Sequence, residues 1–464
     1  MLVVPSRVLE RFQQALLSKR GNPLTNNQLA RAATELVDRV AVGGGSVRQE
    51  EEGGRPGPPG WKHVLEGGGG RKSKKAGSLV AAHTLLRGPP TFVASVHAIA
   101  SALGVDVSEV GRAGPTEPSV TDDASGPVSV SVLDYGAGCG SSSLALMEVL
   151  PLAAKATPGL ERSPLEFRLD CVEPSEALRR SGLRVVPDAF WSRGIRTLTG
   201  SRAGPRYDVA LACFSLSEIE EGARRAKELD KIWSLVRPGG LLVVVEPGTP
   251  RGFHTVAKVR ERVLEMGKHG GLRVLAPCTH LLSCPMATTT EEEEEEEEGR
   301  SQKKKKKNLK KKKVGEWCHF AQPYRREGDR SRKGSLAPVA HWANYARARP
   351  GASLSPRRER REGGYSEKFS YLAVQKEKEE EGEEGKGNSI VEQLVGGERK
   401  GGREGRIVGT PRKRGGHVIF RLCDDEEGPA GGGRVSNVVV TRSDPEYGEL
   451  KAKKWGDVIA MGRS

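Results

Sequence analysis

In the central part of the chain, short β-branched apolar runs alternate with stretches of helical spacing. The runs predict four strands, at Val128–Asp134, Phe167–Glu173, Tyr207–Cys213 and Gly240–Glu246. The stretches between them predict helices around Leu144–Leu150, Ser175–Ser181 and Glu218–Val236. Strands joined by helices usually form a parallel sheet with crossover connections. The pattern therefore predicts a doubly wound α/β domain over residues 128–275.

The first 110 residues show helical patterns only. Apolar positions recur at helical spacing near the start of the chain, at Val8, Phe12, Ala15 and Leu16. They suit either a transit peptide or the first helix of the folded protein, and we favour the helix. Helical spacing continues at 23–40 and 91–103, whereas residues 43–77 are rich in glycine, proline and lysine and predict a flexible insert. We expect an N-terminal helical region.

The last part of the chain, residues 276–464, combines β patterns with low-complexity sequence. Three low-complexity inserts interrupt it, at 287–315, 326–364 and 376–405. Between them lie ordered segments at Trp317–Gln322, Tyr365–Val374, Gly416–Cys423 and Arg434–Arg442. Val418, Phe420 and Leu422 alternate with polar residues, as do Val438 and Val440, which is typical of half-buried strands. We expect a small β-containing C-terminal module with the inserts in surface loops.

The charge of the chain favours a polyanionic partner. The 464 residues carry a net charge of +15. Eight glutamates at 291–298 nearly cancel nine lysines within 303–313, so the excess lies elsewhere, for example at Arg357–Arg361. Any one charge run fits a solvated loop, but the sum predicts salt-sensitive contacts with RNA or DNA phosphates. No apolar stretch reaches the length of a membrane helix, so we expect no membrane partner.

A glycine-rich turn follows the first predicted strand of the α/β domain. Gly136, Gly138 and Gly140 allow a tight turn and close approach of a ligand, and Asp134 ends the strand at the crevice where such sheets bind ligands. Glu173 closes the next strand, where an acid can accept hydrogen bonds from ribose hydroxyls. These five residues form the candidate cofactor site. A Rossmann-type turn for another nucleotide, or for none, is the alternative.

The loop after the third predicted strand, ACFSLSEI at 212–219, offers no clear catalytic group. It has neither a proline pair nor a polar amide that could orient an amine. Glu218 is read most simply as a first-turn helix residue, and Cys213 as a buried structural thiol. We therefore assign no catalytic residue.

The seven cysteines separate into two groups. Their odd number and the lack of a signal-peptide pattern favour reduced thiols over disulfides. Three lie in predicted core elements and read as small apolar residues: Cys139, Cys171 and Cys213. The other four lie in the last part of the chain: Cys278, Cys284, Cys318 and Cys423. Four thiolates can hold a 4Fe-4S cluster or a zinc ion, and His280 or His319 could replace one of them at zinc. Spacing alone leaves a cluster, zinc and no metal open.

Several motifs together resemble a known family. They are APCTHLLSCP from Ala276, WCHFAQ from Trp317, EKFSYL from Glu367, the GHVI block that ends in Cys423, KWGD from Lys454, EPGTPR from Glu246, RGPPTF from Arg87 and the glycine turn. In this order and combination they resemble the methyltransferase-like family of mitochondrial small-ribosomal-subunit assembly factors. The long insert between Cys284 and Cys318 departs from the short connection of that family.

The resemblance implies a class I methyltransferase-like (Rossmann-like) fold and a 4Fe-4S cluster on the four C-terminal cysteines, with zinc as the alternative. It implies an assembly factor that docks on small-subunit ribosomal RNA in the mitochondrial matrix, with the plastid as the open alternative, and we expect a monomer off the ribosome. S-adenosylmethionine would bind at Asp134, Gly136, Gly138 and Glu173. The alternative function is an active S-adenosylmethionine-dependent rRNA methyltransferase.

Overall fold

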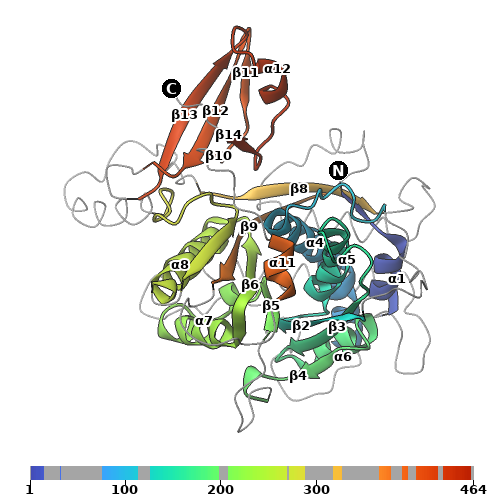
Figure 1. The fold of residues 1–464 in the computed structure, drawn as a ribbon. Coiled ribbons are helices and arrows are strands. Elements are labelled where there is room, and N and C mark those ends of the chain that lie inside the picture. Colours follow the sequence, from blue (N-terminus) through green and yellow to red (C-terminus); the bar gives the residue numbers. More distant parts are fainter. Residues whose placement is uncertain are drawn as a thin grey trace, which may run out of the picture.

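The computed structural model describes residues 2–14, 32, 76–112, 126–197, 207–268, 271–287, 317–326, 365–377, 389–395, 404–426 and 432–460. They form a large sheet covered by helices and a smaller sheet that projects from one end (Figure 1). The predicted helix at 23–40 lies outside these ranges apart from Ala32, and so do most of the predicted inserts.

The core of the large sheet is parallel. Its strands are β2 (Val128–Tyr135), β3 (Leu165–Val172), β4 (Phe190–Ser192), β5 (Tyr207–Cys213) and β6 (Val236–Pro247), in the spatial order β6-β5-β2-β3-β4. The chain builds outward from β2 to β4 and then returns to place β5 and β6 on the other side of β2. This reversal is the switch point of a doubly wound sheet, where ligands bind beyond the carboxyl ends of the strands. The predicted class I methyltransferase-like fold is confirmed.

Beyond β6 the sheet continues with an antiparallel strand, β9 (Tyr365–Lys376). The other edge of β9 pairs with β7 (Leu272–Ala276) and β8 (Phe320–Arg326), and β8 pairs in parallel with β1 (Leu2–Val4). The sequence pattern assigned the β8 and β9 segments to the C-terminal module, whereas they are strands of the large sheet. The reason is burial: seven consecutive residues of β9, Phe369 to Gln375, are buried, which requires cover on both faces.

Helices cover both faces of the large sheet (Figure 1). One core includes residues of α1 (Ser6–Gln14), α4 (Ala76–Leu103), α5 (Ser141–Lys155), α6 (Glu176–Val185) and α11 (Ile390–Val395). The other core lies under α7 (Ala223–Leu235) and α8 (Pro250–Gly267). In β5, Val209 and Leu211 belong to the first core, and Ala210 and Ala212 to the second. The strand alternation therefore divides the interior into two layers.

The smaller sheet contains β10 (Glu404–Ile407), β11 (Arg412–Arg414), β12 (His417–Asp424), β13 (Arg434–Thr441) and β14 (Val458–Ala460), with α12 (Tyr447–Leu450) beside it. Val418, Phe420, Leu422 and Val440 are buried in its own core, as their alternation predicted. Within the described ranges, no helix is long and apolar enough to cross a membrane.

Candidate metal centre and cofactor crevice

The four C-terminal cysteines meet where the two sheets join. Cys278 follows β7 by two residues, Cys284 lies in the same loop, and Cys318 precedes β8 by two residues. Cys423 lies on β12 of the smaller sheet. The thiols are close enough to interact electrostatically, because a thiolate at any of the other three cysteines would raise the pKa of Cys318. The structure thus brings together four thiols from three separate segments.

The surroundings of these thiols oppose ionisation. Burial and, to a lesser extent, the neighbouring Cys278 raise the pKa of the Cys284 thiol to about 11. The pKa values of Cys318 and Cys423 also lie well above the ordinary value of a thiol. Burial is the main cause, and repulsion from neighbouring thiolates is the second. A site of this kind needs added positive charge before its thiols lose their protons at neutral pH.

Hydrogen bonds from both sheets hold the cysteine loops. Trp317 Nε1 donates to the Gly248 carbonyl at 3.2 Å, and Ser370 Oγ donates to the Cys318 carbonyl at 2.7 Å. From the smaller sheet, the Gly433 amide donates to the Ser283 carbonyl at 2.9 Å. Apolar residues complete the surroundings: Phe253, Ala257, Met286, Val408 and Val435. The cysteine loops are therefore fixed by packing and not only by the thiols.

Two buried arginines lie beside the thiols. Arg260 on α8 is 3% exposed and donates from Nη2 to the His280 carbonyl at 2.9 Å. Arg406 on β10 is 8% exposed and donates from Nη1 to the Gly456 carbonyl at 2.6 Å. Nε and Nη1 of Arg260 and Nε of Arg406 have no hydrogen-bond partner among the described residues. Since unsatisfied buried cations are costly, this arrangement favours an anionic group at the cysteines.

The arginine charges reach the cysteines directly. Arg260 lowers the pKa of Cys284 and Cys423, and Arg406 lowers that of Cys318, although burial outweighs both. Neither arginine was singled out from the sequence. The signal was present for Arg260, which lies four residues after Val256 and three before Val263, on the buried stripe of α8.

The two histidines differ in their relation to the thiols. His280 Nε2 lies 3.4 Å from the Cys423 sulfur, and burial lowers the pKa of its ring to about 4, so the ring is neutral. His319 instead donates from Nδ1 to the Trp317 carbonyl of its own loop at 3.2 Å and packs edge-on against Trp455. A ligand role at zinc was one interpretation of His319. Its ring instead makes a hydrogen bond within its own loop.

In the part of the chain that the structure describes, no group of three or more His, Cys, Asp or Glu side chains is arranged to hold a single metal ion. Zinc–sulfur bonds are about 2.3 Å long, so four zinc thiolates must nearly touch. An iron–sulfur cube takes one thiolate at each of four corners, which lie further apart. By their chemistry, four thiols from these segments can serve either group.

The predicted glycine turn joins β2 to α5. Gly136, Gly138 and Gly140 have φ angles of 71°, 57° and 84°, which favour glycine. A Cβ on Gly136 would lie 2.3 Å from the Ser215 Cβ, and one on Gly140 would lie 2.6 Å from a Val186 methyl. A Cβ on Gly138 would meet no described atom within 4 Å. Two of the glycines thus serve packing, and only Gly138 borders open space.

The two acids predicted to bind a cofactor support this turn. Asp134 is 1% exposed and accepts hydrogen bonds from Ser142 Oγ, Ser143 Oγ and the Ser143 amide at 2.7 to 3.1 Å. It therefore fixes the first turn of α5. Glu173 accepts from the amides of Gly138 at 3.0 Å and Ser175 at 2.7 Å. These contacts hold the Glu173 carboxylate at the end of β3, beside the glycine turn.

The loop after β5 is held by an acid that the sequence analysis missed. Glu246, buried at the end of β6, accepts from the amides of Leu216 at 2.8 Å and Ser217 at 3.1 Å. Glu218 lies exposed in a 3₁₀ turn, and burial raises the pKa of the Cys213 thiol well above its usual range. Neither is an evident catalytic group.

Glu246 predicts a pH dependence of stability. Burial raises its pKa from 4.5 to about 7, so between these pH values the folded chain holds a proton that the unfolded chain has lost. This residue therefore lowers the free energy of unfolding as pH rises from 4.5 to 7, by about 3 kcal/mol at most. Urea unfolding of wild type and Glu246→Gln across this range should show that the variant lacks this part of the slope. Parallel slopes would contradict the assignment.

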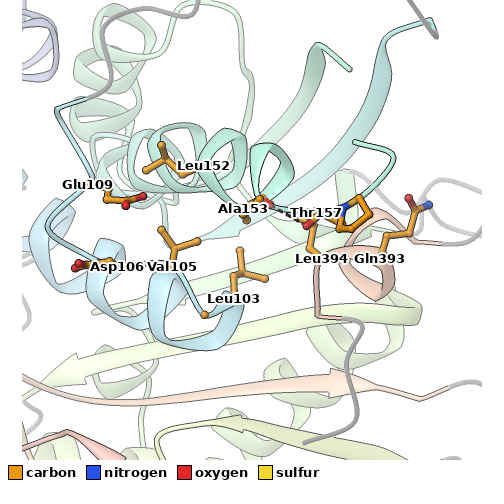
Figure 2. Close-up of a pocket in the computed structure, with 12 residues that line it drawn as sticks. Leu103, Val105, Asp106, Glu109, Leu152, Ala153, Thr157, Gln393 and Leu394 are labelled. Carbon is orange, nitrogen blue, oxygen red and sulfur yellow. Dashed lines mark hydrogen bonds between the residues drawn. The ribbon is translucent and has the colours of Figure 1, made fainter. Parts of the chain in front are cut away.

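A pocket elsewhere does not belong to this site. It has a volume of about 710 Å³ and lies where α4 and α5 end, against α11 (Figure 2). Leu103, Leu152 and Leu394 line it, with the acids Asp106 and Glu109 at one side. Since α5 runs back from the glycine turn, its end lies at the opposite edge of the sheet from the crevice. No predicted site residue lines this pocket.

Three comparisons place the chain among known proteins. Human mitochondrial ribosome assembly protein METTL17 is 28% identical over 166 residues, 34% of each chain. Two mitochondrial Rsm22-cox11 tandem proteins of Schizosaccharomyces pombe are 34% identical over 86 residues, 17% of this chain and 11% of theirs. The chain thus spans about a third or less of the length of these curated relatives.

Solved structures show a weaker likeness. A putative S-adenosyl-L-methionine-dependent methyltransferase from Methanococcus maripaludis is 14% identical, with 44% of this chain and 76% of that chain covered and a TM-score of 0.25. The [4+2]-cyclase SpnF is 16% identical, with 55% and 76% covered and a TM-score of 0.24. The fold assignment therefore rests on strand order and not on these values.

A family model described as mitochondrial small ribosomal subunit Rsm22 matches residues 125–295 and 335–460. These ranges include Cys278, Cys284 and Cys423, while Cys318 lies between them, next to the long insert. The family and the three relatives are all named mitochondrial, which confirms the expected localisation. Because the match takes in more than half of the 464 residues, the chain belongs to the Rsm22 family of the mitochondrial small ribosomal subunit.

Proposed function

We propose that the chain is an assembly factor for the mitochondrial small ribosomal subunit, that it binds small-subunit rRNA through a basic surface, and that it holds a 4Fe-4S cluster. Family membership and the net charge of +15 support the first two parts. The observation that carries the third is the meeting of four thiols from three segments beside two buried arginines.

Cys278, Cys284, Cys318 and Cys423 would be the cluster ligands. A cluster with four thiolates is anionic, and the open N–H groups of Arg260 and Arg406 supply the matching positive charge. When bound, the cluster would join the loops of the large sheet to β12 of the smaller one. Metal binding and folding at this junction would therefore be coupled, and the role of the cluster would be structural.

The function can be tested in cells that lack their own copy of this protein. Restoring wild type should restore sedimentation of complete small subunits and crosslinking of the protein to small-subunit rRNA. A Cys423→Ser chain should fail in subunit assembly because the smaller sheet is no longer tied to the junction. Normal subunits with the Cys423→Ser chain, or no crosslink of wild type to this rRNA, would overturn the proposal.

The second candidate is an active S-adenosylmethionine-dependent rRNA methyltransferase. The open space at Gly138 and the Glu173 carboxylate held against the Gly138 amide favour a cofactor there. The loop after β5, which is held by hydrogen bonds from its amides to Glu246, offers no evident catalytic group. Mapping of small-subunit rRNA methylation with a Glu173→Gln chain separates the two functions. Loss of a specific methyl group would support the enzyme, and unchanged methylation with unchanged assembly would support the factor.

A further inference from the structure

The face of the smaller sheet that points away from its core carries an ordered arrangement of side chains. Because Val418 and Phe420 point into the core, His417 and Ile419 point outward. Register places the outward residues of β11, β12 and β13 in two rows across the sheet. One row is Arg414, His417 and Thr441, and the other is Arg412, Ile419 and Val439.

These rows present cations, and Asp444 accepts hydrogen bonds from the Thr441 amide and hydroxyl at the end of the first row. Arg412 and Arg414 are exposed, and neither side chain has a partner within the described ranges. Neither row contains an Asp or Glu. Val439 is 53% exposed and lies opposite Ile419, so an apolar strip runs beside the arginines. We call this surface, made of Arg412, Arg414, His417, Ile419 and Val439, the outer β face.

We propose that the outer β face binds the sugar-phosphate backbone of small-subunit rRNA. The proposal rests on the proposed function and names the surface that carries it out. Charge complementarity selects the partner, since two exposed arginines in rows that contain no Asp or Glu match phosphates, and the apolar strip can contact ribose carbons. The rows contain no Phe, Tyr or Trp, so bases cannot stack there. Binding at this face should therefore depend on salt and little on sequence.

The position of the face links it to the cysteine junction. β12 carries His417 at one end and Cys423 near the other, so the strand that presents the face also supplies one of the four cysteines. Figure 1 shows the β11–β12 end of the sheet projecting away from the large sheet. Among the described residues, Arg412, Arg414 and Val439 are exposed on this face.

The test uses the full chain, purified anaerobically, and a transcribed small-subunit rRNA fragment. The double variant Arg412→Glu/Arg414→Glu should weaken rRNA binding at least tenfold. The slope of log affinity against log salt concentration should also become shallower by about 1.4 to 1.8, because two phosphate contacts are lost. The matched control is Arg224→Glu/Lys227→Glu, which makes the same charge change on exposed residues of α7. The control should retain at least half of the wild-type affinity.

Other outcomes overturn the inference in distinguishable ways. If the wild-type chain and the Arg412/Arg414 variant bind rRNA equally well, the outer β face is not the rRNA-binding surface, and the proposed function stands. An equal loss of rRNA affinity in the Arg412/Arg414 variant and in the Arg224/Lys227 control would show a general effect of net charge. This result would also rule out the outer β face as the specific binding surface. If wild type binds anionic vesicles but not rRNA, both the face and the proposed RNA binding fail. Thermal melts of the variants should match wild type, because exposed substitutions rarely affect folding.

Discussion

Replacing Cys284 with serine is expected to remove the cluster. A serine hydroxyl is a poor ligand for iron, and the thiols of Cys318 and Cys423 would stay protonated at neutral pH because burial raises the pKa of both. Iron and sulfide should fall to below one per chain, and the free energy of unfolding should fall by roughly 3 to 5 kcal/mol, since the junction loses its anchor. Metal analysis and urea unfolding under argon measure both effects.

The matched control is Cys139→Ser, which makes the same change at a buried cysteine in the core below α4 and α5. Its sulfur lies 3.3 Å from Ser141 Oγ, so a serine there keeps a hydrogen-bond partner. This variant should retain the metal content of wild type. Full iron in Cys284→Ser, or equal iron loss in both variants, would show that Cys284 is not a ligand.

Replacing Arg260 with methionine is expected to destabilise the cluster without removing a ligand. The substitution keeps the side-chain volume in α8 and deletes a positive charge beside Cys284 and Cys423. A nearby cation favours the more negative reduced cluster, so its loss should lower the reduction potential. It should also shorten the lifetime of the cluster in air at least threefold. Voltammetry and the decay of the visible absorption measure these effects.

Two controls separate charge from packing in that experiment. Arg260→Lys restores the charge and should recover most of the potential. Arg225→Met removes another buried arginine, which lies by Thr255 and the loop after β5 and not by the cysteines. It should leave the potential unchanged. A wild-type potential in Arg260→Met, or an equal shift in Arg225→Met, would contradict a role for Arg260 at the cluster.

Local patterns predicted the elements whose neighbours lie close in sequence. β5 has the predicted bounds, Tyr207–Cys213, because a short β-branched run between two helices has one place in a doubly wound sheet. β9 was assigned to the wrong sheet, because low-complexity sequence separates it from both β8 and β10 and hides its partners. The three-residue strand β1 is too short to carry a period.

In the candidate sites too, local sequence predicted the residue types, whereas the contacts between distant segments became known only from the structure. The spacing of the cysteines left their partner open, and only the pairing of β7 and β8 with β9 brings their loops together. The strand-end position of Asp134 predicted a cofactor contact, and its hydrogen bonds with Ser142 and Ser143, which fix the first turn of α5, become evident only in the structure. Arg260 shares the helical spacing of Val256 and Val263, but arginine side chains are usually solvated, so its burial is evident only in the structure.

The central claim is that four cysteines hold an iron–sulfur cluster at the junction of the two sheets. The most direct measurement is Mössbauer spectroscopy with iron and acid-labile sulfide analysis of the full chain purified anaerobically after growth on ⁵⁷Fe. The account predicts four irons and four sulfides per chain and the spectrum of a 4Fe-4S cluster. Colourless protein that contains one zinc per chain, or no metal at all, would contradict it.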